Sequence, residues 1–418
     1  MIRKRQLEKE KIVQEDLEDY SSSDEDEDEE DEEAEIDETP AQKRLRLAKK
    51  YLQEFSNQDN EKIIRIHKKV ADTLTGPDLD NTKVLKNGHK LSVTCLVVSS
   101  DGKFIYSASK DGSIVKWDFI NCKKLKTIPG GRKGDKDHVG HTCVINAIAI
   151  SSDSKFLATG CKNEIINIWN TSDMKFVHTF KGHRGEVNGL AFRRAAHTLY
   201  SCSSDKTVKV WNVDDLCYVE TLFGHQDKVT SIDCGLKEKP ITSGGIDLSL
   251  RIWKIVEESQ LVFYGHKGSI DHVKYIDEDH FISVGDDGII SLYGNVKKNA
   301  IFTSKLAHGE ESSTANWIVS LATAVNTDLF ATAHLSESSG SKDGHIRVWQ
   351  CAPGFTKFEL IFTIPVVGVV NCLQFVNDGD YLVAGIGREH RLGRWWNLKE
   401  AKNSIMIIPM LKLSNHQL

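Results

Sequence analysis

The stretch GHRGEVNGLAFRRAAHTLYSCSSDKTVKVW, residues 182–211, contains the pattern that decides the fold. A Gly-His pair is followed by a run of alternating apolar residues, a turn, a second short run, Asp205 and, six residues later, Trp211. Alternating runs of this length predict half-buried β-strands, and the polar stretches between them predict tight turns. Residues 182–211 are therefore expected to form short consecutive strands.

The same constellation occurs six times along the chain. Gly-His or Ala-His pairs place histidines at positions 89, 141, 183, 225, 266 and 308, with spacings of 52, 42, 42, 41 and 42 residues. Each unit ends in an aromatic residue, which is Trp117, Trp169, Trp211, Trp253, Tyr293 or Trp349. Six residues before each aromatic stands Asp111, Asn163, Asp205, Asp247, Asp287 or Asp343. A period near 42 residues indicates a repeat architecture.

This constellation resembles the WD-repeat family, whose unit is a four-stranded blade of a β-propeller. The resemblance implies that the turn aspartate accepts hydrogen bonds from the histidine and from backbone amides, and that a strand Ser or Thr bridges to the tryptophan. Because a buried carboxylate and a buried imidazole are tolerated only when they satisfy each other, we interpret these residues as structural. The structural set is His89, Asp111, Trp117, His141, Trp169, His183, Asp205, Trp211, His225, Asp247, Trp253, His266, Asp287, His308, Asp343 and Trp349, and Asn163 weakens the motif in the second repeat.

A seventh unit keeps the shape of the repeat without its signature. VVNCLQFVNDGDYLVAGI, residues 369–386, predicts two strands around a turn at 377–379, and REHRLGRWWNL, residues 388–398, predicts a third strand that ends at Trp395-Trp396. The expected fold class is therefore all-β, a seven-bladed WD-repeat β-propeller. Either residues 82–86 or residues 404–410 could form the outer strand of the last blade. We favour the N-terminal segment, because joining it to the last blade removes an open sheet edge.

Three departures from the repeat length predict elaborated loops. The first covers residues 129–139 (PGGRKGDKDHV) and accounts for the 52-residue spacing between the first two histidines. The other two cover residues 309–316 and 336–341 of the sixth unit.

The segment before the repeats divides into an acidic tail, residues 1–38, and a basic helical extension, residues 39–80; the propeller is expected over 81–418. Thirteen of the fifteen residues 24–38 are carboxylates, so disorder is expected there. Ser21, Ser22 and Ser23 suit an acid-directed kinase, and a solubility tail is the alternative. Short helices are predicted over residues 41–55 and 61–74. The cluster Lys43, Arg44, Arg46, Lys49 and Lys50 predicts a nuclear import signal or a phosphate-contacting helix, and a helix packed on the main domain is the alternative.

Composition excludes several other classes of protein. No stretch approaches 18 consecutive apolar residues and the N-terminus has no apolar core, so neither a membrane-spanning helix nor secretion is expected. The nine cysteines include no CxxC pair, which argues against a zinc module and favours free thiols in a reducing compartment. The net charge of −6 is the sum of −14 in residues 1–40 and +8 in residues 41–418. Because the larger part of the chain is mildly basic, nucleic acid is among the candidate partners.

The sequence contains no recognisable catalytic motif, and no cofactor or metal is expected. Basic residues are then the candidates for function. Arg193 and Arg194 occupy the turn after the first strand of the third repeat, with Arg184 upstream, and guanidinium groups suit phosphate. Arg132, Lys133 and Lys136 in the long loop form a second patch, which we expect on the opposite face. Arg388, His390, Arg391 and Arg394 beside two tryptophans form a third, suited to stacking on unpaired bases. Solvated turn residues and core tryptophans are the alternatives.

A narrower resemblance rests on the acidic run, PAQKRLRLAKKYL, GGRKGDK, GHRGEVNGLAFRR and, above all, REHRLGRWW. Together these strings are similar to the WD-repeat proteins specific to the U3 small nucleolar ribonucleoprotein. The resemblance implies a non-catalytic subunit that recognises the box B/C region of U3 small nucleolar RNA together with a kink-turn-binding protein, among other box C/D particle proteins of the small-subunit processome. It also implies pre-18S rRNA processing, small ribosomal subunit biogenesis, and a monomer within a nuclear and nucleolar complex. Arg193 is the leading candidate contact under this resemblance.

Two other classes of function are open. A protein-only scaffold, such as a ubiquitin-ligase substrate receptor or a chromatin adaptor, fits the same fold, but the Trp-Asp-x-x-Arg feature of ligase receptors is absent after Trp117-Asp118. An enzyme that uses the central channel has no sequence feature in its favour.

Overall fold

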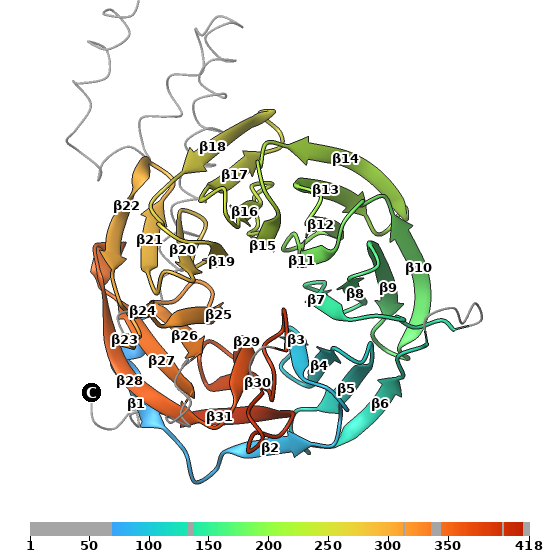
Figure 1. Ribbon diagram of the computed structural model, residues 1–418, viewed down its shortest axis with the longest axis horizontal. Helices are drawn as coiled ribbons and strands as arrows, with labels where there is room; N and C mark the ends of the chain where they lie inside the picture. The colour runs from blue at the N-terminus through green and yellow to red at the C-terminus, as the bar shows by residue number, and fades with distance from the viewer. Residues whose placement is uncertain (1–68, 133–137, 312–313, 336–343, 395–396, 413–418) are drawn as a thin grey trace, which may run out of the picture. The chain divides into compact units, whose positions relative to one another are not determined.

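The computed structural model describes residues 69–132, 138–311, 314–335, 344–394 and 397–412. Within these residues, seven antiparallel sheets are arranged in a ring (Figure 1), and a small two-stranded sheet formed by β23 (Glu310–Glu311) and β24 (Thr314–Ala315) accompanies the sixth. The inner strands of the ring line a central channel. The predicted seven-bladed β-propeller is therefore confirmed.

Six blades each consist of four strands that follow one another in the chain. Blade 1 contains β3 (Val93–Val98), β4 (Phe104–Ser109), β5 (Ile114–Asp118) and β6 (Lys124–Ile128), and blade 2 contains β7 (Ile145–Ile150), β8 (Phe156–Cys161), β9 (Ile165–Asn170) and β10 (Lys175–Lys181). Blade 3 contains β11 (Val187–Phe192), β12 (Thr198–Ser203), β13 (Thr207–Asn212) and β14 (Cys217–Phe223), and blade 4 contains β15 (Val229–Asp233), β16 (Ile241–Gly244), β17 (Leu250–Lys254) and β18 (Ser259–Phe263). Blade 5 contains β19 (Ile270–Tyr275), β20 (His280–Gly285), β21 (Ile290–Gly294) and β22 (Lys297–Ser304), and blade 6 contains β25 (Trp317–Thr323), β26 (Leu329–Leu335), β27 (Gly344–Cys351) and β28 (Phe358–Val366).

The seventh blade joins the two ends of the repeat region. Its inner strands are β29 (Val369–Val376) and β30 (Tyr381–Gly387), as predicted, but its third strand is β31 (Ser404–Lys412). The predicted third strand over 388–398 is wrong, because the described residues of that segment (388–394 and 397–398) belong to a connecting loop, in which Glu389 and Asn397 form one isolated bridge. Both candidate segments take part in closing the ring. The N-terminal segment is the outer strand, because β2 (Lys83–Lys86) pairs on the outer edge of β31. Residues 404–412 form β31, the third strand of the blade, rather than the outer strand.

The ring also begins earlier than predicted. The last residues of the helix expected over 61–74 form a short 3-10 turn (Ala71–Thr73), and Leu74 opens β1 (Leu74–Pro77), which pairs with the end of β31. The compact unit that contains the propeller spans Ile66–Leu418, so its boundary precedes residue 81. The acidic tail, Ser21–Ser23 and the basic cluster at 43–50 lie outside the described residues.

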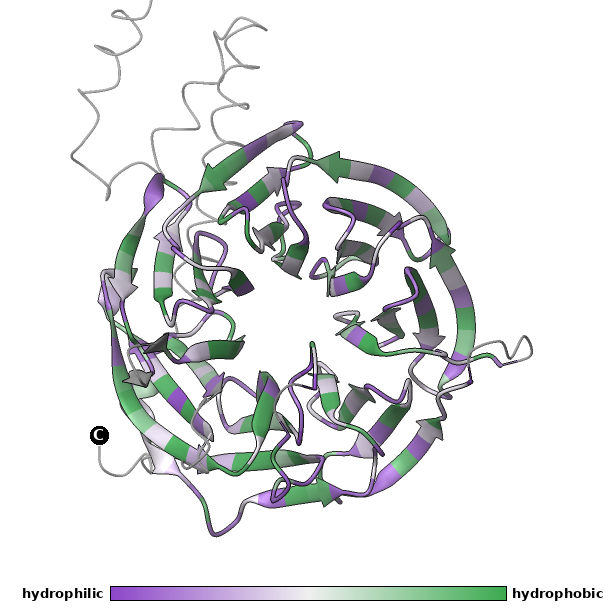
Figure 2. Cartoon of the chain, viewed as in Figure 1, coloured by the Kyte–Doolittle hydropathy of each residue, from purple (hydrophilic) through white to green (hydrophobic). Residues whose placement is uncertain are grey.

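The core lies between neighbouring blades. One apolar residue near the start of each second strand is fully buried: Ile105, Leu157, Leu199, Ile241, Phe281, Phe330 and Leu382. Figure 2 shows hydrophobic residues along the strands of each blade and many hydrophilic residues in the connecting loops. Burial of these apolar surfaces against the adjacent sheet stabilises the ring, since no single blade can cover its own faces.

A β-bulge recurs at the start of every inner strand. The pairing register shifts between Val93 and Cys95 in blade 1 and at the equivalent position of each later blade, so one residue per blade is left out of the ladder. The bulge residues are Thr94, Asn146, Asn188, Thr230, Asp271, Val319 and Asn371. They form a ring around one end of the channel.

The antiparallel order gives the propeller two distinct faces. Loops that enter each inner strand, and loops between second and third strands, lie on one side, which we call the His–Asp face because the repeat histidines and aspartates stand there. Loops that follow each inner strand, and loops between third and fourth strands, lie on the other side, which we call the hairpin face.

Candidate functional site

The repeat residues form a hydrogen-bond chain inside each blade. In blade 3, Trp211 Nε1 donates to Ser201 Oγ (2.8 Å), Ser201 lies 2.7 Å from His183 Nε2, and His183 Nδ1 lies 2.9 Å from Asp205. Asp205 also accepts from the backbone amide of Arg184 at 2.9 Å. The chain assigns the His183 tautomer, with the proton on Nδ1 donated to the carboxylate. These residues therefore tie the loops of the His–Asp face to the sheet.

Blades 4 and 5 repeat this contact, with His225 2.7 Å from Asp247 and His266 3.1 Å from Asp287. In blade 1, Ser113 stands between the partners: His89 Nδ1 contacts Ser113 Oγ at 2.7 Å, and Ser113 donates to Asp111.

Two blades depart from the pattern. In blade 2, Asn163 contacts Thr142 (3.2 Å) and leaves the buried Nδ1 of His141 without a partner among the described residues. Burial lowers the pKa of His141 to about 4, so the ring is neutral. In blade 6, His308 Nδ1 lies 2.9 Å from His334 Nδ1, and Asp343 lies outside the described residues.

Arg193 and Arg194, which follow β11, lie on the hairpin face, and the side chain of Arg193 contacts two residues of the next blade. Arg193 Nε donates to the carbonyl of Leu236 at 2.9 Å, and its Nη1 forms an ion pair with Glu238. Arg194 is half-buried, and its backbone amide donates to Gly235 at 3.1 Å. The guanidinium group of Arg193 therefore contacts the loop between β15 and β16 of blade 4.

Arg184 and the long loop lie on the opposite, His–Asp face. Arg184 precedes β11 whereas Arg193 follows it, so the strand separates them. Arg132 is exposed in the loop between β6 and β7, on the same face as Arg184. Lys133 and Lys136 fall outside the described residues.

The four residues of the third predicted patch, Arg388, His390, Arg391 and Arg394, lie in different environments. Arg388 and Arg394 are exposed, with Arg388 Nε bonded to the carbonyl of Ala401 (2.8 Å) and Arg394 beside Glu389. His390 is fully buried with its ring centroid 4.5 Å from that of Trp317, and burial lowers its pKa to about 3. Arg391 lines the central channel. Stacking of His390 on an unpaired base is therefore excluded in this arrangement, and Trp395 and Trp396 lie outside the described residues.

Charge is distributed unequally between the two faces. Described loops of the hairpin face carry 14 carboxylates and 8 Lys or Arg residues, whereas those of the His–Asp face carry 12 carboxylates and 14 Lys or Arg residues. Four of those 12 carboxylates, Asp111, Asp205, Asp247 and Asp287, already accept hydrogen bonds within their own blades. The His–Asp face therefore offers the more positive surface to an anionic partner.

Four of the bulge residues, Thr94, Asn188, Thr230 and Asn371, donate a side-chain hydrogen bond to the next blade around the channel. Thr94 Oγ1 donates to the carbonyl of Ile145 (2.6 Å), and Asn371 Nδ2 donates to that of Val93 (2.9 Å), which joins blade 7 to blade 1. Asp271, which has no proton to donate when ionised, accepts from Trp317 instead. Sequence reasoning missed these residues, although a polar residue five positions after each of the first five repeat histidines was a visible signal.

Among the residues that the structure describes, no group of three His, Cys, Asp or Glu side chains is placed to hold a metal ion. No helix in these segments is long and apolar enough to cross a membrane.

The ring of blades held by His–Asp and Ser–Trp contacts defines a WD-repeat β-propeller. A family model described as "WD domain, G-beta repeat" matches residues 81–118, 134–170, 174–212 and 216–254. The chain is 47% identical over 405 residues to human U3 small nucleolar RNA-interacting protein 2, covering 90% of this chain and 84% of the relative, and 48% identical to the mouse protein, covering 90% and 83%. It also resembles a solved structure described as "Structure of U3-55K", with 48% identity, a TM-score of 0.74, and coverage of 80% of this chain and all of that one. The chain belongs to the family of U3 small nucleolar RNA-interacting protein 2.

Proposed function

We propose that this protein is a non-catalytic subunit of the U3 small nucleolar ribonucleoprotein, and that it binds the box B/C region of U3 RNA together with a kink-turn-binding protein. In this role it supports pre-18S rRNA processing within the small-subunit processome in the nucleolus. Membership of this family supports the proposal that the protein is a subunit of the U3 particle. The unequal charge of the two faces supports the choice of the His–Asp face as the surface that contacts the RNA.

The observation that carries the proposal is a set of exposed cations whose backbones are fixed. Lys90, Arg184 and Lys267 each directly follow a repeat histidine, and each backbone amide donates to the repeat aspartate at 2.8–2.9 Å. Their side chains are exposed and have no partner among the described residues. A cation on an anchored backbone loses less entropy on binding than one on a mobile loop, so it suits phosphate recognition.

Other exposed arginines extend this set. Arg132 stands in the long loop entering blade 2, and Arg388 and Arg394 stand in the loop of blade 7, all on the His–Asp face. Arg193 is less suited to phosphate, because it lies on the more acidic face and its side chain is 29% exposed, against 69% for Arg394. Both Glu238 and Leu236 also hold its guanidinium group. The RNA surface we propose is therefore Lys90, Arg132, Arg184, Lys267, Arg388 and Arg394.

Charge reversal on each face tests this assignment. The variant Lys90→Glu/Arg184→Glu/Lys267→Glu is compared with Arg193→Glu/Arg194→Glu for binding to box B/C RNA assembled with the kink-turn-binding protein. We expect the first variant to lose at least tenfold in affinity and the second to bind nearly as wild type, with both melting near the wild-type temperature. Loss in the second variant alone would move the interface to the hairpin face, and unchanged binding in both would contradict RNA recognition by either surface.

A further inference from the structure

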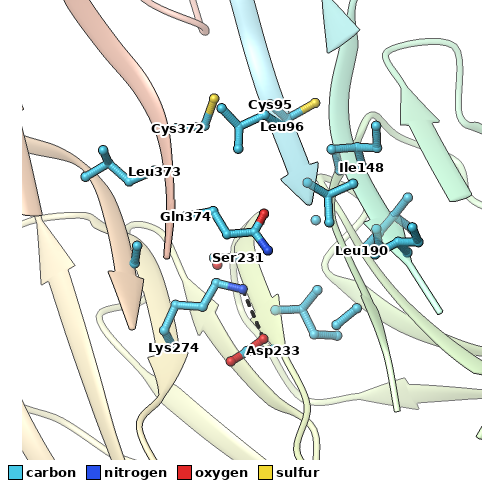
Figure 3. Close-up of a pocket in the computed structure, with 18 of the residues that line it drawn as sticks. Cys95, Leu96, Ile148, Leu190, Ser231, Asp233, Lys274, Cys372, Leu373 and Gln374 are labelled. Carbon is cyan, nitrogen blue, oxygen red and sulfur yellow. Dashed lines mark hydrogen bonds and ion pairs between the residues drawn. The ribbon is translucent and has the colours of Figure 1, made fainter. Parts of the chain in front are cut away.

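The propeller encloses a central cavity of about 500 Å³ that nothing described above uses. Its wall is built from the inner strands of the blades, and it extends from the turns after those strands, including Arg194, to the bulge ring and Arg391. Figure 3 shows that aliphatic side chains such as Leu96, Ile148 and Leu373 share this wall with polar ones. Small-molecule sites are concave and combine apolar surface with polar groups that fix the orientation of the ligand.

Arg391 supplies a cation to the bulge-ring end of this cavity. Its backbone amide is fixed to Asn371 Oδ1 at 2.8 Å, and its Nε is buried without an acceptor among the described residues. Burial raises the pKa of Cys95 in blade 1 and of Cys372 in blade 7, and the charge of Arg391 opposes both shifts. Arg391 is also one of the residues that line the cavity wall.

The charged groups beside Arg391 and at the other end of the inner strands have partners of their own. Lys274 pairs with Asp233 at 3.0 Å near the hairpin-face ends of β19 and β15 (Figure 3). At the bulge ring, Asp271 accepts from Trp317 without forming an ion pair with Arg391. His272 is neutral, because burial lowers its pKa well below the usual value, and its Nε2 has no partner among the described residues. Arg391 Nε and His272 Nε2 are thus buried polar atoms at this end that have no hydrogen-bond partner among the described residues.

We propose that the central channel binds an aliphatic monocarboxylate, with the carboxylate on the guanidinium of Arg391 and the aliphatic body against Leu96, Ile148 and Leu373. A guanidinium and a carboxylate fit as a planar two-point pair. The neighbouring carboxylate of Asp271 disfavours a dianion such as a phosphate monoester, whereas a single negative charge matches the one unpaired cation at this end of the described wall. The carboxylate belongs either to a free acid or to the C-terminal aliphatic residue of a peptide. The inference does not depend on RNA binding.

The test uses the full-length protein and four probes: hexanoate, N-acetyl-leucine, the neutral N-acetyl-leucinamide, and inorganic phosphate. Binding is followed by the Arg391 Nε–H resonance, which is assigned as the signal missing from the spectrum of Arg391→Gln. We expect N-acetyl-leucine to shift this resonance, N-acetyl-leucinamide to leave it unchanged, and Arg391→Gln to bind at least tenfold more weakly in a titration by calorimetry. Arg391→Lys keeps the positive charge but not the planar guanidinium group, so its affinity for N-acetyl-leucine should lie between those of the wild type and Arg391→Gln.

The probes also separate the two sources of the carboxylate. Hexanoate that binds as well as N-acetyl-leucine indicates a free acid, whereas binding of N-acetyl-leucine alone indicates a peptide C-terminus. Equal binding of the acid and the amide, tighter binding of phosphate, or no shift with any probe in the wild-type protein overturns the proposal. Because the shift is measured on the wild type, poor folding of a variant cannot hide this outcome.

Discussion

Leu85 in β2 lies directly opposite Ile405 in β31, so residues from the two ends of the propeller share one strand pair. Both side chains are buried in a cluster that also contains Val93 and Trp117 of blade 1 and Val383 of blade 7. Closing the ring in this way covers the edge of β31 and locks the first blade to the last.

Shortening Leu85 to Ala should therefore destabilise the whole propeller. We expect a cost of about 2–4 kcal/mol in the free energy of unfolding, since a buried leucine is replaced without a side chain to fill the space. Val84 is the matched control, because it lies in the same strand but is 39% exposed, and Val84→Ala should cost under about 0.5 kcal/mol. Urea unfolding of the two variants measures the difference. Equal effects would show that β2 does not hold the ring closed.

Asn163→Asp should stabilise the protein, which is unusual for a polar substitution. The buried Nδ1 of His141 has no acceptor among the described residues, whereas the equivalent nitrogen of His183 donates to Asp205 at 2.9 Å. A carboxylate at position 163 should restore that bond and add about 1 kcal/mol at pH 7. The pKa of His141 should rise above its present value of about 4. Thermal unfolding and imidazole resonances of the variant check both effects, and a lower melting temperature would contradict the assignment.

Stability should decrease in acid through the repeat aspartates. Burial acts to raise the pKa of Asp247, but hydrogen bonds from His225 and Ser249 outweigh it and hold the pKa near 2. A group whose pKa is lowered in the folded state stabilises the protein above its unfolded pKa of about 4 and loses that contribution as the pH falls towards 2. Urea unfolding at pH 5 and pH 3 should show the loss. Asp247→Asn should be less stable at pH 5 and should decline less between the two values.

The fold was predictable because the repeat signature is local. His183, Asp205 and Trp211 lie within one blade and contact one another, so their spacing specifies the sheet without knowledge of the rest of the chain. The seventh blade has no such signature. Its third strand was therefore assigned to 388–398, where Trp395 mimicked the end of a repeat, although the strand is formed further on by Ser404–Lys412.

The site was harder to predict, because the direction of a side chain depends on the packed ring. Arg388 and Arg391 are three residues apart in one basic string, yet one is exposed and the other lines the channel. Likewise, the sequence shows Arg193 as a turn residue but not its partner Glu238, which comes from a loop of the next blade. Contacts between blades join residues about 40 positions apart, and no local pattern reports them.

The salt dependence of RNA binding should identify individual phosphate contacts. Removing one cation that touches a phosphate should reduce the slope of log affinity against log salt concentration by roughly 0.7–0.9. Arg184→Ala should therefore give a shallower slope and weaker binding at low salt. Lys155→Ala, on the hairpin face and already paired with Asp153 at 3.1 Å, is the control and should leave the slope unchanged. Equal slopes for wild type and Arg184→Ala would remove Arg184 from the interface.

Glu238→Gln tests the role of Arg193 without removing it. The substitution ends the ion pair and leaves the guanidinium of Arg193 more available, while keeping a side chain of similar size. Because both partners are about one-third exposed, the free energy of unfolding should change by less than about 1 kcal/mol. If RNA binds the His–Asp face, affinity for the box B/C complex should stay within twofold of wild type. If Arg193 contacts phosphate, the loss of a competing carboxylate should strengthen binding severalfold at low salt. A filter-binding titration at two salt concentrations distinguishes these outcomes, and a severalfold increase would return Arg193 to the interface.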